Sequence, residues 1–193
     1  MTNLTNKKGV TLTELMVVLA IVMITAAIAI PAYVSDLPRQ RAKAAAQGMH
    51  ADLRLARSRA VANNTPYLVC FTSTSYQLVS AANCQAAGVT TIDKTVDFEK
   101  DYKGVRFGVG GSTGACKETT SHEPIYFPGG SMARFDIRGS SVDGNGTFYP
   151  GGVVYLTNTL DPNQSAYCVQ VEGTTGRAKL YRWNAKSSPP AWE

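Results

Sequence analysis

The fold of this chain is decided near its start, by Lys7-Lys8-Gly9-Val10-Thr11-Leu12-Thr13-Glu14 and the apolar run over residues 15–32 that follows. No side chain of that run carries a charge. At about 1.5 Å of rise per helical residue, the run is long enough to cross the hydrocarbon core of a bilayer. A carboxylate such as Glu14 would cost roughly 2.5–3.5 kcal/mol at the bilayer centre and less near an interface, so we expect it to have a partner. The two lysines indicate the cytoplasmic side.

This stretch resembles the class III leader of type IV pilins and pseudopilins. The resemblance implies that a prepilin peptidase cuts between Gly9 and Val10, and that the new terminal residue, Val10, is N-methylated. It also makes Glu14 the family's glutamate five residues beyond the cut, and it places Pro31 where the family has a helix-bending proline. Val10 departs from the phenylalanine that the family usually has. An ordinary signal anchor or a secretory signal peptide is the alternative, although a secretory peptide needs an apolar region of only about 7–15 residues.

Two interpretations of Glu14 follow. In a filament, its carboxylate can pair with the amino group of Val10 in a neighbouring subunit and so set the axial register. Alternatively, it is a carboxylate that is merely tolerated near the membrane interface. The resemblance favours the assembly role for Glu14, together with Pro31.

The composition allows one membrane helix and one globular domain of ordinary size. The chain has 193 residues, of which 44% are hydrophobic and 17% are charged, as in a folded protein without a large disordered part. Its formal net charge is +5, and Lys7 and Lys8 supply two of these charges. Such a mildly basic balance says little about nucleic-acid binding.

All four cysteines lie beyond the apolar run, and their spacings match no C-x-x-C redox or zinc pattern. An even number of cysteines in a domain outside the cytoplasm favours two disulfides. Among the three pairings that four cysteines allow, we favour Cys70–Cys84, which would close a local hairpin region, and Cys116–Cys168. Free buried thiols are the alternative.

A second helical pattern follows Pro31. Apolar residues recur there at spacings of three and four, which makes one apolar face of a helix. These residues are Ala42, Ala45, Met49, Leu53, Ala56 and Ala60. The polar stretch Asn63-Asn64-Thr65-Pro66 is a stop signal. We therefore expect one long, bent helix from about residue 10 to residue 62, with its first half in the membrane and its second half packed on a domain.

Beyond Pro66, short runs rich in β-branched and aromatic residues predict strands between glycine and proline clusters. The runs are 67–71, 76–79, 95–98, 105–107, 124–127, 134–137, 147–148, 152–156, 166–171 and 178–182. The predicted fold class is α+β, with a long N-terminal helix packed on an antiparallel β-domain. The predicted parts are a cleaved leader over 1–9, a transmembrane and assembly helix over 10–33, its amphipathic half over 34–64, a β-rich domain over 65–186 and a loose tail over 187–193.

The later chain resembles the GspH/FimT/FimU branch of the pilin-like proteins. The segment 49–61 is similar to the branch's L-x-x-A-R-S-x-A-V helix end, through Leu53, Ala56, Arg57, Ser58, Ala60 and Val61. A strand motif follows at Gly104-Val105-Arg106-Phe107. The branch's Phe-x-x-x-Gly region is matched by Phe127 to Gly130, which is one residue shorter, or by Phe148 to Gly152. The final hairpin has Thr175-Gly176-Arg177. The resemblance implies a pilin-like fold and a non-enzymatic role.

The final hairpin is also a candidate DNA-binding site. Arg177, Lys179, Tyr181 and Trp183 alternate along one face of the predicted strand, and Arg182 adds a further cation. Cations interleaved with aromatic rings suit a phosphate backbone and stacked bases. FimT proteins that assist DNA uptake have a similar Gly-Arg-x-Arg sequence, in which this chain replaces the second arginine by lysine. Protection of an edge strand is the alternative.

No motif supports catalysis, a cofactor or a metal site. The stretch Asp143-Gly144-Asn145-Gly146-Thr147 resembles the opening of a calcium loop, but Val154 stands where an EF-hand would have its glutamate, so we expect a tight turn. The glycines of Gly108-Val109-Gly110-Gly111 lack the helix of a dinucleotide-binding loop. We expect His50 and His122 to be surface residues.

The sequence therefore predicts a minor pilin or pseudopilin of a type IV pilus or a type II secretion filament, which primes assembly or forms the tip. Its expected partners are other minor pilins, the major pilin or pseudopilin, the inner-membrane assembly platform and, for processing, the prepilin peptidase. Its expected location is the bacterial inner membrane, with a periplasmic C-terminal domain, and then the filament. The alternatives are a DNA-binding minor pilin for natural transformation and a membrane-anchored periplasmic binding domain.

Overall fold

The computed structural model describes residues 9–80, 84, 92–117, 120–128, 130–143, 145–149, 151–187 and 191–193. Its contacts divide the chain into two compact units, Met1–Leu37 and Pro38–Glu193. One helix, α1 (Leu12–Ala62), contributes to both units. The strands and a second, short helix lie in the second unit.

A capping hydroxyl begins helix α1, and a residue with a left-handed backbone ends it. The Thr11 hydroxyl accepts a hydrogen bond from the backbone N–H of Glu14 at 3.2 Å, so Thr11 caps the helix and α1 starts at Leu12 rather than at the predicted residue 10. At the other end, Asn64 has φ +51° and the N–H of Thr65 donates to the carbonyl of Ala60 at 3.3 Å. This left-handed stop before Pro66 confirms the predicted end of the helix.

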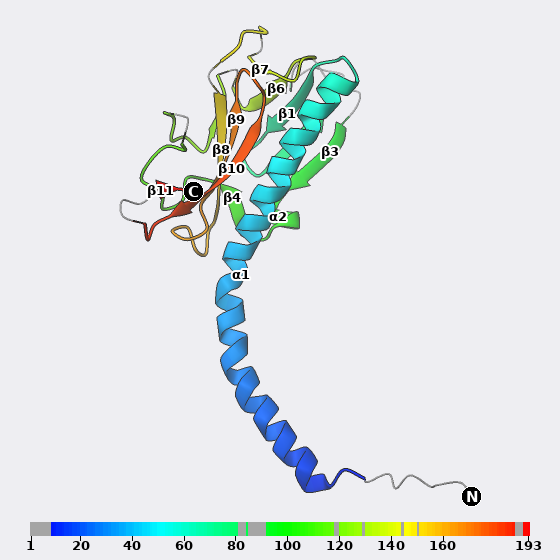
Figure 1. Cartoon of the computed structure of the whole chain (residues 1–193), viewed down its shortest axis with the longest axis vertical. Coiled ribbons are helices and arrows are strands. Elements are labelled where there is room, and N and C mark those ends of the chain that lie inside the picture. Colours follow the sequence, from blue (N-terminus) through cyan, green and yellow to red (C-terminus); the bar gives the residue numbers. More distant parts are fainter. Residues whose placement is uncertain are drawn as a thin grey trace, which may run out of the picture. The chain divides into compact units, whose positions relative to one another are not determined.

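The second unit contains two antiparallel sheets (Figure 1). Their strand orders are β3-β2-β1-β6-β7 and β11-β10-β9-β8-β4, and β5 also pairs with β8. The strands are β1 (Tyr67–Phe71), β2 (Ser75–Val79), β3 (Ile92–Asp97), β4 (Val105–Phe107), β5 (Ile125–Tyr126), β6 (Met132–Phe135), β7 (Ser141–Val142), β8 (Gly151–Asn158), β9 (Tyr167–Glu172), β10 (Ala178–Asn184) and β11 (Ala191–Trp192); the short helix is α2 (Phe98–Asp101). The fold class is α+β and pilin-like, as the sequence predicts.

The main core lies between the second half of α1 and both sheets. The predicted apolar face of the helix is fully buried there, and its alanines bring the helix backbone close to the strands. Residues of β1 such as Val69 and residues of β9 such as Val171 belong to the same core. Figure 1 shows this cyan part of α1 lying along the strands.

The two regions that resemble the Phe-x-x-x-Gly motif contact each other through Phe127 and Gly152. The ring of Phe127 lies where a Cβ on Gly152 would stand, and it stacks on Phe71 with ring centroids 5.6 Å apart. Gly152 therefore makes room in β8 for Phe127, so one packing contact joins the two candidate regions.

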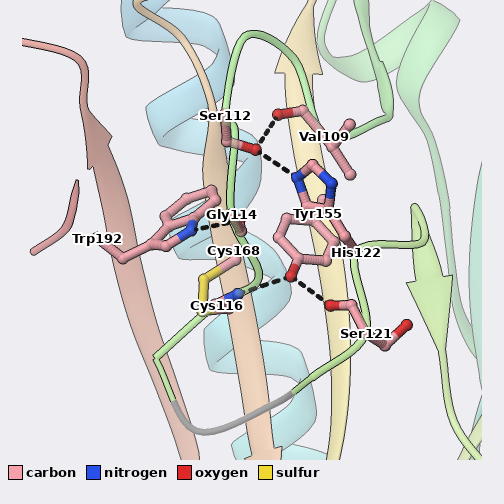
Figure 2. Close-up of a disulfide and its surroundings, with 9 residues drawn as sticks. All are labelled: Val109, Ser112, Gly114, Cys116, Ser121, His122, Tyr155, Cys168 and Trp192. Carbon is pink, nitrogen blue, oxygen red and sulfur yellow. Dashed lines mark hydrogen bonds between the residues drawn. A yellow bond between two sulfur atoms is a disulfide. The ribbon is translucent and has the colours of Figure 1, made fainter. Parts of the chain in front are cut away.

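A second cluster lies on the other face of β8 and β9. It contains Tyr155, Trp183 and Trp192, together with the disulfide between Cys116 and Cys168 (Figure 2). The other disulfide joins Cys70 and Cys84. These are the pairings that the sequence favours.

The prediction of a loose tail over 187–193 is wrong for the described part of that tail. Ala191 and Trp192 form β11, which pairs with β10, and Trp192 is only 6% exposed. The indole N–H of Trp192 donates to the carbonyl of Gly114 at 3.0 Å (Figure 2). Burial of one large aromatic side chain outweighs the loop-forming composition around it.

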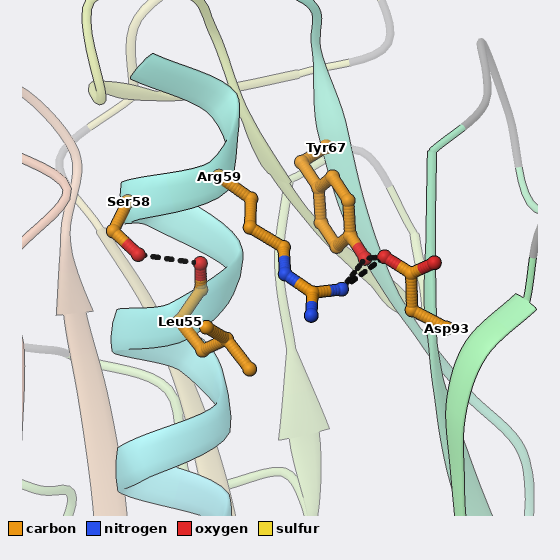
Figure 3. Close-up of polar contacts among 5 residues, drawn as sticks. All are labelled: Leu55, Ser58, Arg59, Tyr67 and Asp93. Carbon is orange, nitrogen blue, oxygen red and sulfur yellow. Dashed lines mark hydrogen bonds and ion pairs between the residues drawn. The ribbon is translucent and has the colours of Figure 1, made fainter. Parts of the chain in front are cut away.

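Polar contacts attach β3 to α1. Arg59 and Tyr67 both hydrogen-bond to the carboxylate of Asp93 (Figure 3). Two turns earlier on the helix, the buried carboxylate of Asp52 accepts from the Tyr76 hydroxyl at 2.8 Å and from Lys94 Nζ at 2.7 and 2.8 Å. A buried carboxylate is costly unless it is paired, so these contacts fix the position of the helix against the edge of the sheet.

Because two buried tyrosines have raised pKa values, we expect the free energy of unfolding to fall at alkaline pH. Burial raises the pKa of Tyr149 to about 12, and burial with the nearby Asp52 raises that of Tyr76 further. Because the unfolded phenol titrates near pH 10, the stabilisation is complete below that pH and is lost as the pH rises toward the folded pKa. We expect Tyr149 to contribute a fall of about 1 kcal/mol in the free energy of unfolding between about pH 9 and pH 11.

Denaturant titrations of the full chain at both pH values measure this fall. Tyr149→Phe should decrease it by about that amount, whereas Tyr126→Phe, at a half-exposed position, should leave it unchanged. Equal pH dependence in the Tyr149 variant and the unmodified chain would contradict the assignment.

Candidate functional site

The predicted processing residues lie at the exposed start of the chain. Val10 is 73% exposed, and Glu14 is exposed in the first turn of α1. A Cβ added to Gly9 would meet no atom within 4 Å, and Gly9 does not have a positive φ. Nothing in the fold of the described chain therefore requires glycine at position 9.

The first unit has an apolar helix whose described side chains are mostly exposed. The large apolar side chains from Leu15 to Val34 are between 51% and 74% exposed. An 18-residue window of α1 has a mean hydropathy of 2.7, and by length and composition the helix can cross a membrane. A surface of this size needs lipid or other apolar helices to cover it. Pro31 lies within this part of α1.

The Thr-Gly-Arg motif forms a turn over 172–177 that packs directly on a loop over 136–141. Gly176 has φ +61°, and a Cβ there would overlap the carbonyl oxygen of Gly139. The Ser140 hydroxyl donates to the carbonyl of Thr174 at 2.8 Å, and the N–H of Ser141 donates to the carbonyl of Gly173 at 2.8 Å. Glycine is therefore needed at position 176 for two reasons: the backbone there is left-handed, and it lies against the backbone of Gly139.

The same turn and the helix enclose a cationic cleft of about 520 Å³, which we call the arginine cleft. It is lined by His50, Arg54, Arg57, Ser58, Thr175, Arg177 and Ala178. Among the described residues, no carboxylate lines it. The helical members follow the spacing i, i+4, i+7 and i+8, which brings them to one face of α1.

Contacts with the backbone hold two members of the arginine cleft. The Nε2–H of His50 donates to the carbonyl of Ala178 at 3.1 Å, and Arg57 Nε donates to the carbonyl of Gly139 at 3.0 Å. Arg54 and Arg177 are exposed. The cleft therefore combines two side chains held by the backbone with two exposed guanidinium groups, an arrangement suited to oxyanions.

The structure does not bring the predicted DNA-binding residues onto one open face. Trp183 is only 4% exposed and packs on Trp192, with ring centroids 5.3 Å apart. Lys179 Nζ pairs with Glu172 at 3.0 Å, and hydrogen bonds from Thr175 and Lys179 lower the pKa of that glutamate.

Tyr181 and Arg182 complete this set. Tyr181 lies beneath the ammonium of Lys117, which is 5.8 Å from the ring centroid. Arg182 is exposed, and its backbone pairs with that of Glu193. Arg177 is therefore the member of the set that joins the arginine cleft, with helix residues that the sequence did not single out as a binding site.

The other polar motifs form local structure. The Asp143 carboxylate accepts hydrogen bonds from the N–H groups of Asn145 and Thr147, at 2.9 and 2.7 Å, as in the predicted tight turn. His122 is exposed, its Nε2 lies 3.0 Å from the Ser112 hydroxyl, and its ring packs edge-on against Tyr155 (Figure 2).

Two family models match the chain. The model described as type II transport protein GspH matches residues 45–175, and that of the prokaryotic N-terminal methylation motif matches residues 4–30. The searches of curated proteins and of solved structures give no match.

An exposed apolar helix with a methylation motif, followed by a helix-on-sheet domain, defines a membrane-anchored, pilin-like structural subunit. Because the GspH match covers more than half of the 193 residues, the chain belongs to the GspH family, as a minor pilin or pseudopilin of a type II secretion system or type IV pilus.

Proposed function

We propose that this chain is a minor filament subunit that primes assembly or forms part of the tip complex. The observation that carries the proposal is the exposed apolar surface of α1, which has a carboxylate, Glu14, at its start and overlaps the matched methylation motif over residues 4–30. The mechanism is non-enzymatic: packing of apolar helices replaces lipid contacts as subunits join.

Each part of the chain has a role in this mechanism. The leader over 1–9 is removed at the inner membrane, and residues 10–33 hold the subunit there with the β-domain in the periplasm. The new amino group of Val10 then pairs with Glu14 of a neighbouring subunit, and Pro31 allows the helix to bend as it packs. Residues 34–64 carry the β-domain over 65–186 to the filament surface. The partners are other minor pilins, the major pilin or pseudopilin and the assembly platform.

Mass spectrometry of sheared filaments tests processing and assembly together. We expect an N-terminal peptide that begins at Val10 and carries one extra methyl group. Gly9→Val is the control, because a side chain at this open position leaves the fold unchanged while it obstructs the peptidase. That variant should remain full-length and absent from filaments.

The proposal would be contradicted if the unmodified chain also stayed full-length in the membrane and never yielded a peptide starting at Val10. That result would favour the membrane-anchored periplasmic binding domain.

DNA binding is the less well-supported function. The burial of Trp183 and the pairing of Lys179 with Glu172 remove two of the groups on which that hypothesis depended. Arg177 and Arg182 remain exposed. Salt-sensitive retardation of DNA by the chain, lost in Arg177→Gln with Lys179→Gln, would restore this hypothesis.

A further inference from the structure

We propose that the arginine cleft binds an acidic segment of a neighbouring filament subunit. Carboxylates of that segment pair with Arg54 and Arg177, and an apolar side chain beside them packs on Ala51 and Leu55. The identity of the partner as a filament subunit rests on the proposed function; the chemistry of the site rests on the cleft itself.

Positive charge gathers at the arginine cleft. Arg54 and Arg177 approach the cleft from α1 and from the turn that precedes β10, and both are exposed. The carboxylate nearest along the chain to Arg177 is Glu172, which accepts hydrogen bonds from Thr175 at 2.6 Å and Lys179 at 3.0 Å; the charge of Arg177 adds to these contacts in lowering the pKa of Glu172. Two guanidinium groups beside one cleft are suited to carboxylate pairs, which they can bind in bidentate geometry.

An apolar surface adjoins this positive charge. A shallower depression of about 340 Å³ is lined by Ala51, Arg54, Leu55 and Ser58, so it shares Arg54 and Ser58 with the arginine cleft. Leu55 is 37% exposed although it lies in the domain half of the helix. Ser58 is exposed beside it, and in Figure 3 the Ser58 side chain points away from Arg59, which extends to Asp93.

This combination favours a peptide over nucleic acid. Single-stranded nucleic acid is bound by a track of cations for its phosphates and by open aromatic rings for its bases, but Lys179 is paired with a carboxylate and Trp183 is buried. An acidic peptide with an apolar side chain matches both the guanidinium groups and Leu55.

The test measures binding of a labelled peptide to the full chain in detergent micelles at low ionic strength. The probe is fluorescein-Gly-Asp-Leu-Glu-Asp-Leu-Gly, followed by fluorescence anisotropy; the same peptide with Asn and Gln in place of its acids is the uncharged control. We expect saturable binding of the acidic peptide that weakens as salt is added.

Variants locate the binding site. Arg54→Gln with Arg177→Gln should lower the affinity at least tenfold, and Leu55→Ser should lower it severalfold. Arg57 is left intact because it holds Gly139. Arg106→Gln, at an exposed arginine of β4, is the matched control and should have no effect. Thermal unfolding of each variant shows that the fold is retained.

Two results would overturn the proposal. One is absent peptide binding, or binding that the double variant leaves unchanged. The other is tighter binding of a labelled DNA duplex than of the peptide, dependent on Arg54 and Arg177 but not on Leu55, which would assign the cleft to nucleic acid. The measurement requires neither leader cleavage nor filaments, so its failure would leave the proposed assembly role standing, and failure of the filament tests would leave peptide binding intact.

Discussion

Glu14→Ala is expected to lower incorporation of the chain into filaments to a few per cent of its normal level. In the proposed filament, the Glu14 carboxylate and the amino group of Val10 in a neighbouring subunit form an ion pair among apolar helices. Removal of one partner leaves the other charge unpaired, which costs about 3–5 kcal/mol for a buried pair. Immunoblots of sheared filaments, normalised to the membrane-bound chain, measure the ratio.

The controls for this prediction separate charge from hydrophobicity. Glu14→Gln keeps the size of the side chain and should fail like Glu14→Ala, because only the charge has been lost. Met16→Ala removes an apolar group two residues away and should be incorporated nearly normally. Peptides starting at Val10 should appear in all variants, since processing precedes assembly. Normal incorporation of Glu14→Ala would show that the carboxylate is merely tolerated.

Gly176→Ala is expected to decrease the free energy of unfolding by about 3 kcal/mol. About 1–2 kcal/mol comes from the left-handed conformation at φ +61°. The rest comes from overlap with the carbonyl of Gly139, since extra atoms in a packed site typically cost about 1–3 kcal/mol. Denaturant unfolding of the full chain measures the change.

Two other glycines isolate these contributions. Gly146 also has a positive φ, +83°, but a Cβ there would meet nothing within 4 Å, so Gly146→Ala should show the conformational cost alone. Gly114→Ala, at an open position without a positive φ, should be nearly neutral. A Gly176→Ala effect no larger than that of Gly146→Ala would mean that the turn over 172–177 can move away from the loop over 136–141.

Periodicity made the helix and the longer strands predictable. The alanine-rich face from Ala42 to Ala60 repeats over five turns, and a stop signal follows it, so both the existence and the end of α1 were accessible from the sequence. Two-residue strands such as β7 have no period to detect. β11 depends on Trp192 packing against Trp183 and against Tyr155, and Tyr155 lies 37 positions earlier in the sequence.

The arginine cleft could not be predicted from the sequence for a related reason. Arg54 and Arg57 have the spacing of a solvated helix face, and nothing local indicates that Arg177 lies beside them, about 120 positions later. The Thr-Gly-Arg motif was visible, but its alternation suggested that Arg177 belonged with Trp183. The approach of Gly176 to Gly139 instead directs the turn toward the helix.

The two disulfides also limit how far the domain can lengthen when it is pulled. Each anchors at the central strand of its own sheet, Cys70 in β1 and Cys168 in β9. They enclose sequence separations of 14 and 52 residues. At roughly 3.4 Å per extended residue, these segments would otherwise release about 50 and 180 Å of chain. A filament subunit built this way can lose its hydrogen bonds under tension and still transmit force through a short, covalently closed path.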